Sequence, residues 1–264
     1  MPLSRGSEGG AYSASLTTPW LLHPRASAKP ACRLFCFPFA GGGGAMYVQW
    51  ARVLSEELEL FAVQLPARET RREEPPHTRF FPLIDALADA LQPWLAPPFV
   101  LFGHSMGALL AFELTRELRR RDWPLPSRLL LSGRQAPTIP DQGLPIQHLP
   151  DAEFIAQLTQ RYGGIPEPIL RDPDFLQLFL PTLRADFDVL ASYVYRPEPP
   201  LPCPISAYCG RRDQRVRPEA LMDWRWQTTG GFETRWFEGD HFYFQTDRAP
   251  VLQAIQADMQ ALLI

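Results

Sequence analysis

The chain has 264 residues, of which 45% are apolar and 21% are charged, and its formal net charge is −3. These values are those of a soluble globular protein with one large domain or two small ones. The negative net charge argues against a nucleic-acid binder, and no stretch reaches the roughly 18 apolar residues of a membrane span.

The beginning of the chain differs in composition from the rest. Residues 1–30 are rich in Ser, Gly, Ala and Pro and carry no hydrophobic periodicity. They lack the apolar core of about 7–15 residues that a secretory signal needs. We therefore expect a flexible leader, followed by a single folded domain over 31–264, in a cytoplasmic protein with a monomer as the default state.

The cysteines stand in apolar surroundings, and none belongs to a C-x-x-C pair. They are Cys32, Cys36, Cys203 and Cys209. This pattern predicts small buried side chains rather than a disulfide framework, a zinc site or a redox pair. We expect neither a metal ion nor another cofactor.

Short apolar runs alternate with amphipathic segments along the domain. The runs are residues 33–38, 58–65, 99–103, 128–133, 204–210 and 232–239, and most of them are apolar at nearly every position. The segments with a period of 3.6 residues are 81–95, 107–121, 219–227 and 250–263. Strands that are apolar on both sides are typical of a parallel sheet covered on both faces. The alternation therefore predicts a doubly wound α/β domain with a mostly parallel sheet.

One long interval breaks this alternation. Between about residues 136 and 202 there is no good strand candidate, whereas 151–164 and 173–195 have helical patterns separated by Pro and Gly. A helical insertion of this length between two strands predicts a lid over one edge of the sheet.

The sequence Gly103-His104-Ser105-Met106-Gly107 has the form G-x-S-x-G. The motif alone is weak, but here it lies between an apolar strand and an amphipathic helix, which is the setting of a nucleophile elbow. The two glycines leave room for a sharp turn and for close packing of the strand on the helix. The helix N-terminus offers free N–H groups to developing negative charge. Ser105 is therefore the candidate nucleophile.

A serine nucleophile needs a base and an acid that orients it. Of the five histidines, His241 directly follows the last predicted strand, at the carboxyl end where open α/β sheets place their sites. Asp213 follows the preceding strand and can hold the imidazole in the right tautomer. Asp240 adjoins the histidine, but neighbouring side chains in a loop usually diverge. Asp186 and Asp188 lie on a predicted lid helix, as surface or lid-packing carboxylates.

The strand at 33–38 runs into four glycines at 41–44. A phosphate-binding loop would need G-K-[ST] after this run, and a dinucleotide site would need G-x-G-x-x-G; neither is present. The remaining interpretation is a turn that supplies a backbone N–H to an oxyanion. One donor is then the N–H of Met106, which follows the nucleophile. The second is the N–H of Ala40, with Phe39 as the alternative.

Together these segments resemble the type II thioesterases of polyketide and nonribosomal peptide synthesis, in the α/β-hydrolase superfamily. The matching segments cover most of the chain and read CFPFAGGGG, LPARETRREEP, LFGHSMGALLAFEL, LFLPTLRADFDVLASY, CGRRDQRV and FEGDHFYF. The resemblance implies an α/β-hydrolase fold. It places the family's triad on Ser105, Asp213 and His241, and its oxyanion donors on Ala40 and Met106.

Two positions depart from the family's pattern. The family usually has Pro-Gly-Arg where this chain has Pro66-Ala67-Arg68, and it often has His or Tyr where Phe39 stands. Ala67 argues against a role for the backbone of that loop, and Phe39 argues against side-chain chemistry at position 39.

The resemblance implies hydrolysis of acyl groups held as thioesters on the phosphopantetheine arm of an acyl or peptidyl carrier protein, in trans, as an editing step. The alternatives are a medium-chain acyl-carrier-protein hydrolase of fatty acid synthesis, a generic carboxylesterase, and a non-catalytic binding protein of the same fold. The insertion would then cover an acyl chamber or simply pack on the sheet. Its apolar face would consist of Phe175, Leu176, Phe179, Leu180, Leu183 and Phe187.

Overall fold

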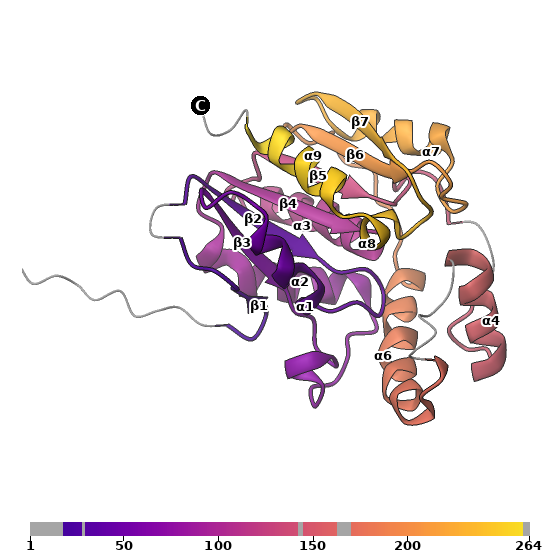
Figure 1. Cartoon of the computed structure of the whole chain (residues 1–264). Helices are drawn as coiled ribbons and strands as arrows, with labels where there is room; N and C mark the ends of the chain where they lie inside the picture. Colours follow the sequence, from indigo (N-terminus) through magenta and orange to yellow (C-terminus); the bar gives the residue numbers. More distant parts are fainter. Residues whose placement is uncertain (1–17, 28–29, 142–144, 163–169, 261–264) are drawn as a thin grey trace, which may run out of the picture.

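The computed structural model describes residues 18–27, 30–141, 145–162 and 170–260. Within these residues, seven strands form one sheet in the order β1-β3-β2-β4-β5-β6-β7 (Figure 1). β1 is antiparallel to β3, and every other neighbouring pair is parallel. The strands are β1 Leu21–Leu22, β2 Cys32–Phe37, β3 Leu58–Val63, β4 Phe99–His104, β5 Arg128–Ser132, β6 Ile205–Gly210 and β7 Phe232–Phe237. The six predicted strands are all present, with ends that differ by at most two residues.

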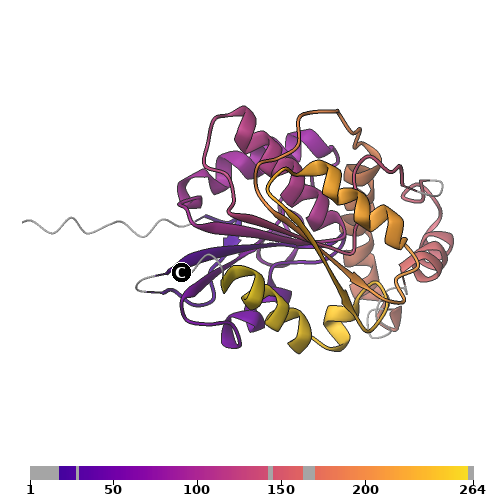
Figure 2. The ribbon, with the colours of Figure 1, turned by 90° about the horizontal axis from the view of Figure 1, so that it is seen from above.

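Helices cover both faces of the sheet (Figure 2). α2, α3 and α7 pack on one face, and α1, α8 and α9 pack on the other. The α-helices are α1 Ala45–Val48, α2 Phe80–Leu91, α3 Met106–Arg120, α4 Asp151–Tyr162, α6 Pro173–Ala191, α7 Pro218–Met222, α8 Tyr243–Thr246 and α9 Ala249–Gln260. Short 3-10 helices are η1 Gln49–Arg52, η2 Glu69–Arg71, η3 Gln92–Trp94 and η4 Asp223–Gln227.

Two predicted helices are shorter than the sequence pattern suggested. The helix expected over 81–95 is α-helical only to Leu91 and continues as a 3-10 turn that contains Pro93. Proline has no N–H to donate to the helical hydrogen-bond ladder, so an α-helix ends readily at this point. The helix expected over 219–227 is divided in the same way between α7 and η4.

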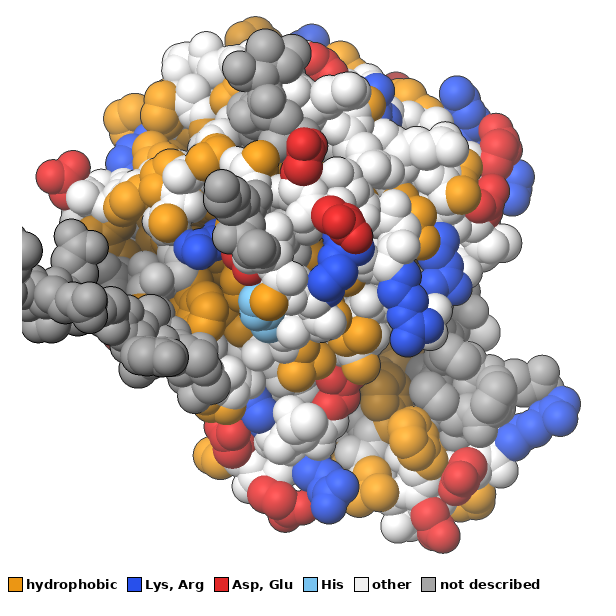
Figure 3. Space-filling view, turned by 60° about the vertical axis from the view of Figure 1, so that its left-hand side comes forward, with side chains coloured by type: hydrophobic (Ala, Val, Ile, Leu, Met, Phe, Trp, Pro, Cys, Tyr) orange, Lys and Arg blue, Asp and Glu red, His pale blue; other side chains and the backbone are white. Residues whose placement is uncertain are grey.

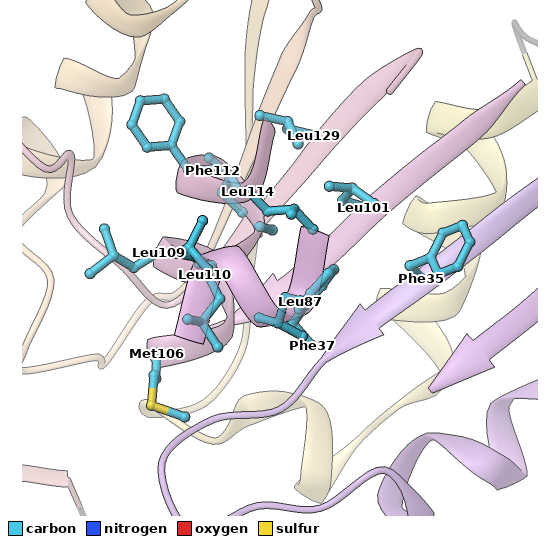
Figure 4. Packing of buried hydrophobic residues seen from close by; sticks show 14 of the residues in the cluster. Phe35, Phe37, Leu87, Leu101, Met106, Leu109, Leu110, Phe112, Leu114 and Leu129 are labelled. Carbon is cyan, nitrogen blue, oxygen red and sulfur yellow. The ribbon is translucent and has the colours of Figure 1, made fainter. Parts of the chain in front are cut away.

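Alternate residues of the central strands belong to different cores. In β2, Phe35 and Phe37 face the α2–α3 side, whereas Leu34 and Cys36 face the α1–α9 side. Successive side chains of a strand point to opposite faces, so a strand covered on both faces must be apolar throughout. Figure 4 shows the α2–α3 side, where side chains of β2, β4 and β5 meet those of α3.

The expectation of a flexible leader up to residue 30 is wrong in part. Residues 18–27 are described, and Leu21 and Leu22 pair antiparallel with Val63 and Ala62 of β3. Nearby, the guanidinium of Arg71 lies 4.1 Å from the centre of the Trp20 ring. A two-residue strand carries no periodicity to detect, so composition alone could not reveal it. Residues 1–17 lie outside the described residues.

The interval between β5 and β6 contains helices α4 and α6 and, in its described residues, no strand. Both helices lie beside one end of the sheet in Figures 1 and 2. The carboxylate of Asp172 caps the N-terminus of α6, because it accepts the N–H of Phe175 at 3.0 Å. Phe154, Leu158 and Phe187 belong to a small apolar cluster that joins α4 to α6. The predicted helices are therefore present, although α6 ends at Ala191 rather than near residue 195.

Charged side chains are mixed on the molecular surface. On the face in Figure 3, acidic and basic groups are interspersed among apolar and uncharged ones. Of the helices in the described ranges, none combines the length and apolar character that crossing a membrane requires.

Candidate active site

Ser105 lies in a strained turn between β4 and α3. Its φ of 54° and ψ of −111° are unusual for a residue other than glycine. A Cβ atom at Gly103 would lie 2.0 Å from the carbonyl oxygen of Gly107, and one at Gly107 would lie 2.2 Å from that of Phe37. Both glycines of the motif are therefore required by close backbone packing. The N–H of Ser105 donates to the carbonyl of Ser132 at 2.8 Å, which ties the turn to the neighbouring strand.

The loops after β6 and β7 bring an acid and a histidine together. His241 Nδ1 lies 2.8 Å from Asp213 Oδ2, and both side chains are almost completely buried. The other carboxylate oxygen, Oδ1, accepts the N–H of Arg215 at 2.8 Å. A Cβ atom at Gly210 would lie 2.2 Å from the carbonyl oxygen of Asp240, so the glycine at the end of β6 lets the two loops approach. The bond to Asp213 fixes the orientation of the imidazole. Among the described residues, no group forms a hydrogen bond with its Nε2.

A second histidine lies beside this pair but has a different environment. The ring centre of His104 is 4.9 Å from that of His241. His104 Nδ1 lies 2.8 Å from Ser132 Oγ, which in turn lies 2.6 Å from the hydroxyl of Tyr243. Complete burial, together with the nearby His241, lowers the pKa of His104 well below its usual range. His104 therefore stays neutral, and its hydrogen bond is with Ser132 rather than with Ser105.

The glycine run forms a tight turn above the end of β2. The N–H of Gly42 donates to the carbonyl of Phe39 at 2.9 Å, and Gly41 has a φ of 78°. The N–H of Gly44 donates to Gln64 Oε1 at 2.8 Å. By contrast, no group in the described part of the chain accepts a hydrogen bond from the N–H of Ala40. The same is true of Phe39, so both alternatives for the donor remain open on hydrogen-bond grounds.

Met106 is the first residue of α3. Its N–H has no acceptor within the helix, as is general for the first turn. Because Met106 directly follows Ser105, this N–H is available beside the serine.

A cavity of about 180 Å³ lies between the sheet and the insertion. From the carboxyl edge of the sheet, Ser105, His241 and Ala40 line it. The insertion contributes Leu158, Tyr162, Phe179, Leu183, Phe187 and Leu190. The cavity thus has a polar edge with the serine and histidine, facing a mostly apolar wall.

The sequence of this chain matches known thioesterases over nearly its whole length. Residues 32–259 match the family model described as "Thioesterase domain". The chain belongs to the thioesterase family.

Individual relatives agree with this assignment. This thioesterase is 36% identical to the gramicidin S biosynthesis protein GrsT of Aneurinibacillus migulanus over 244 residues, which cover 92% of this chain and 95% of that protein. The type II thioesterase BorB from the borrelidin biosynthetic cluster has a similar structure, with a TM-score of 0.82 at 33% identity, covering 93% of this chain and 98% of BorB. The RedJ thioesterase of the prodiginine pathway in Streptomyces coelicolor has a TM-score of 0.81 at 36% identity, and the match covers 88% of this chain and 90% of RedJ.

These comparisons confirm the resemblance to type II thioesterases and the predicted α/β-hydrolase fold. The Ser105 turn and the Asp213–His241 pair of this thioesterase lie where the sequence pattern predicted them, at the carboxyl ends of β4, β6 and β7. Of the six apolar residues predicted to form the inner face of the insertion, Phe179, Leu183 and Phe187 line the cavity. Leu180 is buried between the helices, and Phe175 is about half exposed.

The thioesterase also contains a buried ion pair that sequence reasoning did not foresee. Both guanidinium Nη atoms of Arg68 bind the carboxylate of Asp186 on α6, at 2.7 and 2.8 Å. Of the two alternatives predicted for Asp186, a surface or a lid-packing carboxylate, the structure shows the second, because the side chain is buried and paired with Arg68. Arg68 and Asp186 both lie in segments that resemble the family, LPARETRREEP and LFLPTLRADFDVLASY. The sequence alone does not show that two residues so far apart in the chain form a pair.

The loop with Ala67 takes the conformation that glycine would adopt most easily. Ala67 has a φ of 64°, and its carbonyl accepts the hydroxyl of Thr182 on α6 at 2.7 Å. The backbone of this loop therefore has a structural role in the thioesterase despite the absence of glycine.

The cysteines were predicted to be small buried side chains. In the part of the chain that the structure describes, all four are buried and unpaired, as predicted. Burial raises the pKa of the Cys32 thiol to about 12. No group of three or more His, Cys, Asp or Glu residues within the described ranges could hold a metal ion.

Proposed function

We propose that this thioesterase hydrolyses acyl thioesters held on the phosphopantetheine arm of acyl or peptidyl carrier proteins. It acts in trans, as an editing enzyme of polyketide or nonribosomal peptide synthesis. The observation that carries the proposal is the Asp213–His241 pair, whose histidine lines one cavity together with Ser105. The names of GrsT, BorB and RedJ, all of biosynthetic pathways, support the setting.

In the proposed mechanism, Ser105 is the nucleophile. His241 Nε2 accepts its proton as the hydroxyl attacks the thioester carbonyl. Asp213 accepts a hydrogen bond from the Nδ1–H of His241, which fixes the tautomer and stabilises the imidazolium. The imidazolium then protonates the departing thiolate, which leaves as the free thiol of the pantetheine arm. A water activated by the same imidazole hydrolyses the acyl-enzyme and regenerates the serine.

The tetrahedral intermediates need donors for their negatively charged oxygen. We assign this role to the N–H groups of Met106 and Ala40. The N-terminus of α3 adds favourable electrostatics near Ser105. Ala40 is preferred to Phe39 because it stands where the chain turns from β2 into the glycine run, and because the resemblance to the family places the donor there.

The remaining features follow from this assignment. The insertion at about 136–202 acts as a lid whose apolar wall holds the acyl chain, within a single domain that acts as a cytoplasmic monomer. The proposal requires no metal, cofactor, nucleic acid or membrane.

Two experiments test the proposal. A fluorophosphonate probe should label the wild-type protein and leave Ser105→Ala unlabelled. Hydrolysis of an acyl-pantetheine thioester should then be compared with that of the matched oxygen ester. A strong preference for the oxygen ester would favour a carboxylesterase, and absence of labelling would favour a non-catalytic binding protein.

A further inference from the structure

The turn at the glycine run has a peptide group that can adopt two orientations. The bond from Gly42 N–H to Phe39 carbonyl closes a four-residue turn whose central residues are Ala40 and Gly41. The φ of 78° at Gly41 makes it a type II turn. Type I and type II turns differ by a flip of the central peptide, and glycine at the third position tolerates both. The backbone alone therefore does not fix the Ala40–Gly41 peptide.

Asp186 binds this central peptide. The N–H of Gly41 donates to Asp186 Oδ2 at 2.7 Å. The same oxygen accepts from Arg68 Nη1 at 2.8 Å, while Oδ1 accepts from Arg68 Nη2 at 2.7 Å. Arg68 Nη1 also donates to the carbonyl of Gly42 at 2.9 Å. Asp186 and Arg68 thus hold the turn on both sides of Gly41. The side chain of Asp186 is 3% exposed and that of Arg68 is 7% exposed.

Resting on the proposed function, we propose that Asp186 and Arg68 are positioning residues for the oxyanion hole. Asp186 selects the peptide orientation in which Gly41 presents its N–H to α6, and Arg68 holds the carboxylate in place. In the flipped orientation the carbonyl of Ala40 would face the carboxylate, which is unfavourable in a buried site. The N–H of Ala40 belongs to the preceding peptide, whose Phe39 carbonyl accepts the N–H of Gly42. The pair therefore positions this N–H by holding the whole turn in one conformation and in one place beside Ser105.

The packing of α6 reinforces this role. A Cβ atom at Gly41 would lie 2.8 Å from Leu183 Cδ1 and 2.9 Å from Phe179 Cζ, so the side chains of α6 pack directly against the turn. Both side chains also line the cavity. Helix α6 therefore forms part of the wall of the cavity and also holds the turn that contains Ala40, the proposed donor to the reacting carbonyl. A buried, bidentate ion pair suits this purpose because breaking it would leave an uncompensated charge.

The main variant is Asp186→Asn, which keeps the size of the side chain. Its amide NH2 would face an Arg68 nitrogen, two donors in contact, so the bidentate pair is lost. We expect kcat for an acyl-pantetheine thioester to decrease about 10- to 100-fold with little change in KM, because the interaction acts in the transition state.

The matched control is Glu113→Gln. Glu113 is also a buried carboxylate, 1% exposed, and pairs with Arg116 at 2.7 Å away from the cavity lining. Both variants should lower the melting temperature, but only Asp186→Asn should lower kcat when both are assayed well below their melting temperatures. If Asp186→Asn fails to fold, Arg68→Lys replaces it, since lysine keeps the charge without the bidentate geometry. It should show the same selective decrease in kcat.

The outcomes separate this inference from the proposed function. Wild-type kcat retained in Asp186→Asn or in Arg68→Lys would overturn the positioning role. An increase in KM with unchanged kcat would also overturn it, because the pair would then only shape the binding cavity. If the wild type itself neither hydrolyses thioesters nor labels at Ser105, the proposed function fails instead.

Discussion

The carboxyl edge of the sheet and the helical insertion form opposite walls of one cavity, but different forces hold them. At the edge, Ser105 is fixed by a backbone hydrogen bond to the carbonyl of Ser132 and by glycines that allow contact between backbones. His241 is fixed by Asp213. These positions follow from neighbouring strands of one sheet, so the edge is as rigid as the sheet itself.

Helices α4 and α6, which lie in the described part of the insertion, differ from each other in the same respect. α6 is joined to the core by the buried Arg68–Asp186 pair and by the bond from Thr182 to Ala67. α4 packs on α6 through an apolar cluster, and its ion pair between Asp151 and Arg184 is at the surface, with Asp151 70% exposed. Exposed pairs contribute little to stability. We therefore expect the groups at the edge of the sheet to be in place before a substrate binds, and the wall formed by α4 to adjust to the substrate.

Removing the nucleophile at the edge should have the largest effect. We expect Ser105→Ala to lower kcat by about 10⁶, because the serine and its base act as a unit. His241→Ala should cause a similar decrease. Steady-state hydrolysis of an acyl-pantetheine thioester measures both, with unchanged melting curves as the control for folding. Substantial turnover in Ser105→Ala would place the nucleophile elsewhere.

Removing the charge of the acid should have the next largest effect. Asp213→Asn should lower kcat by about 10⁴, since the amide stabilises the wrong tautomer of His241. The neighbouring Asp240→Asn is the matched control, because Asp240 caps only the N–H of Phe242, at 3.0 Å, and should leave kcat nearly unchanged. If the two variants behaved in the reverse way, Asp240 would be the acid.

The contrast between the two walls also explains what the sequence could predict. The elbow and the loops with Asp213 and His241 follow strands that are apolar at every position, so a local pattern locates them. The bond from the N–H of Gly41 to Asp186 joins residues 145 positions apart, and it depends on how α6 packs on the turn. Such a contact is a property of tertiary packing. For the same reason the sequence could not foresee that β1 extends the sheet before residue 30.

A substitution in the adjustable wall should change substrate binding rather than the chemical step. Leu158 on α4 lines the cavity and is 5% exposed. Leu158→Ala should raise KM for a medium-chain acyl thioester about tenfold, because apolar contact with the chain is lost. Its kcat should stay within about twofold of the wild-type value. Leu178→Ala on α6 is the control, since Leu178 is 78% exposed and does not line the cavity.

The opposite result at Leu158 would remove the distinction between the two walls. A decrease in kcat as large as that of Asp186→Asn, with KM unchanged, would mean that α4 also positions the catalytic groups. The ring of Tyr162, at the end of α4, lies 5.4 Å from that of His241, so Tyr162→Phe provides a second measurement at the same helix. It should preserve both constants, because the ring contact is kept.

The smallest expected effect concerns the loop that joins the edge to α6. Ala67→Gly should raise the free energy of unfolding by about 0.5–1 kcal/mol, because relief of the left-handed strain outweighs the greater freedom of the unfolded chain. Urea denaturation measures the change, and kcat should be unaffected since the bond from Thr182 uses the backbone carbonyl. Ala86→Gly, inside α2, is the control and should lower stability by about 1 kcal/mol. A loss of stability in both variants would show that the φ of 64° at Ala67 carries no strain, and that the core meets α6 without conformational cost.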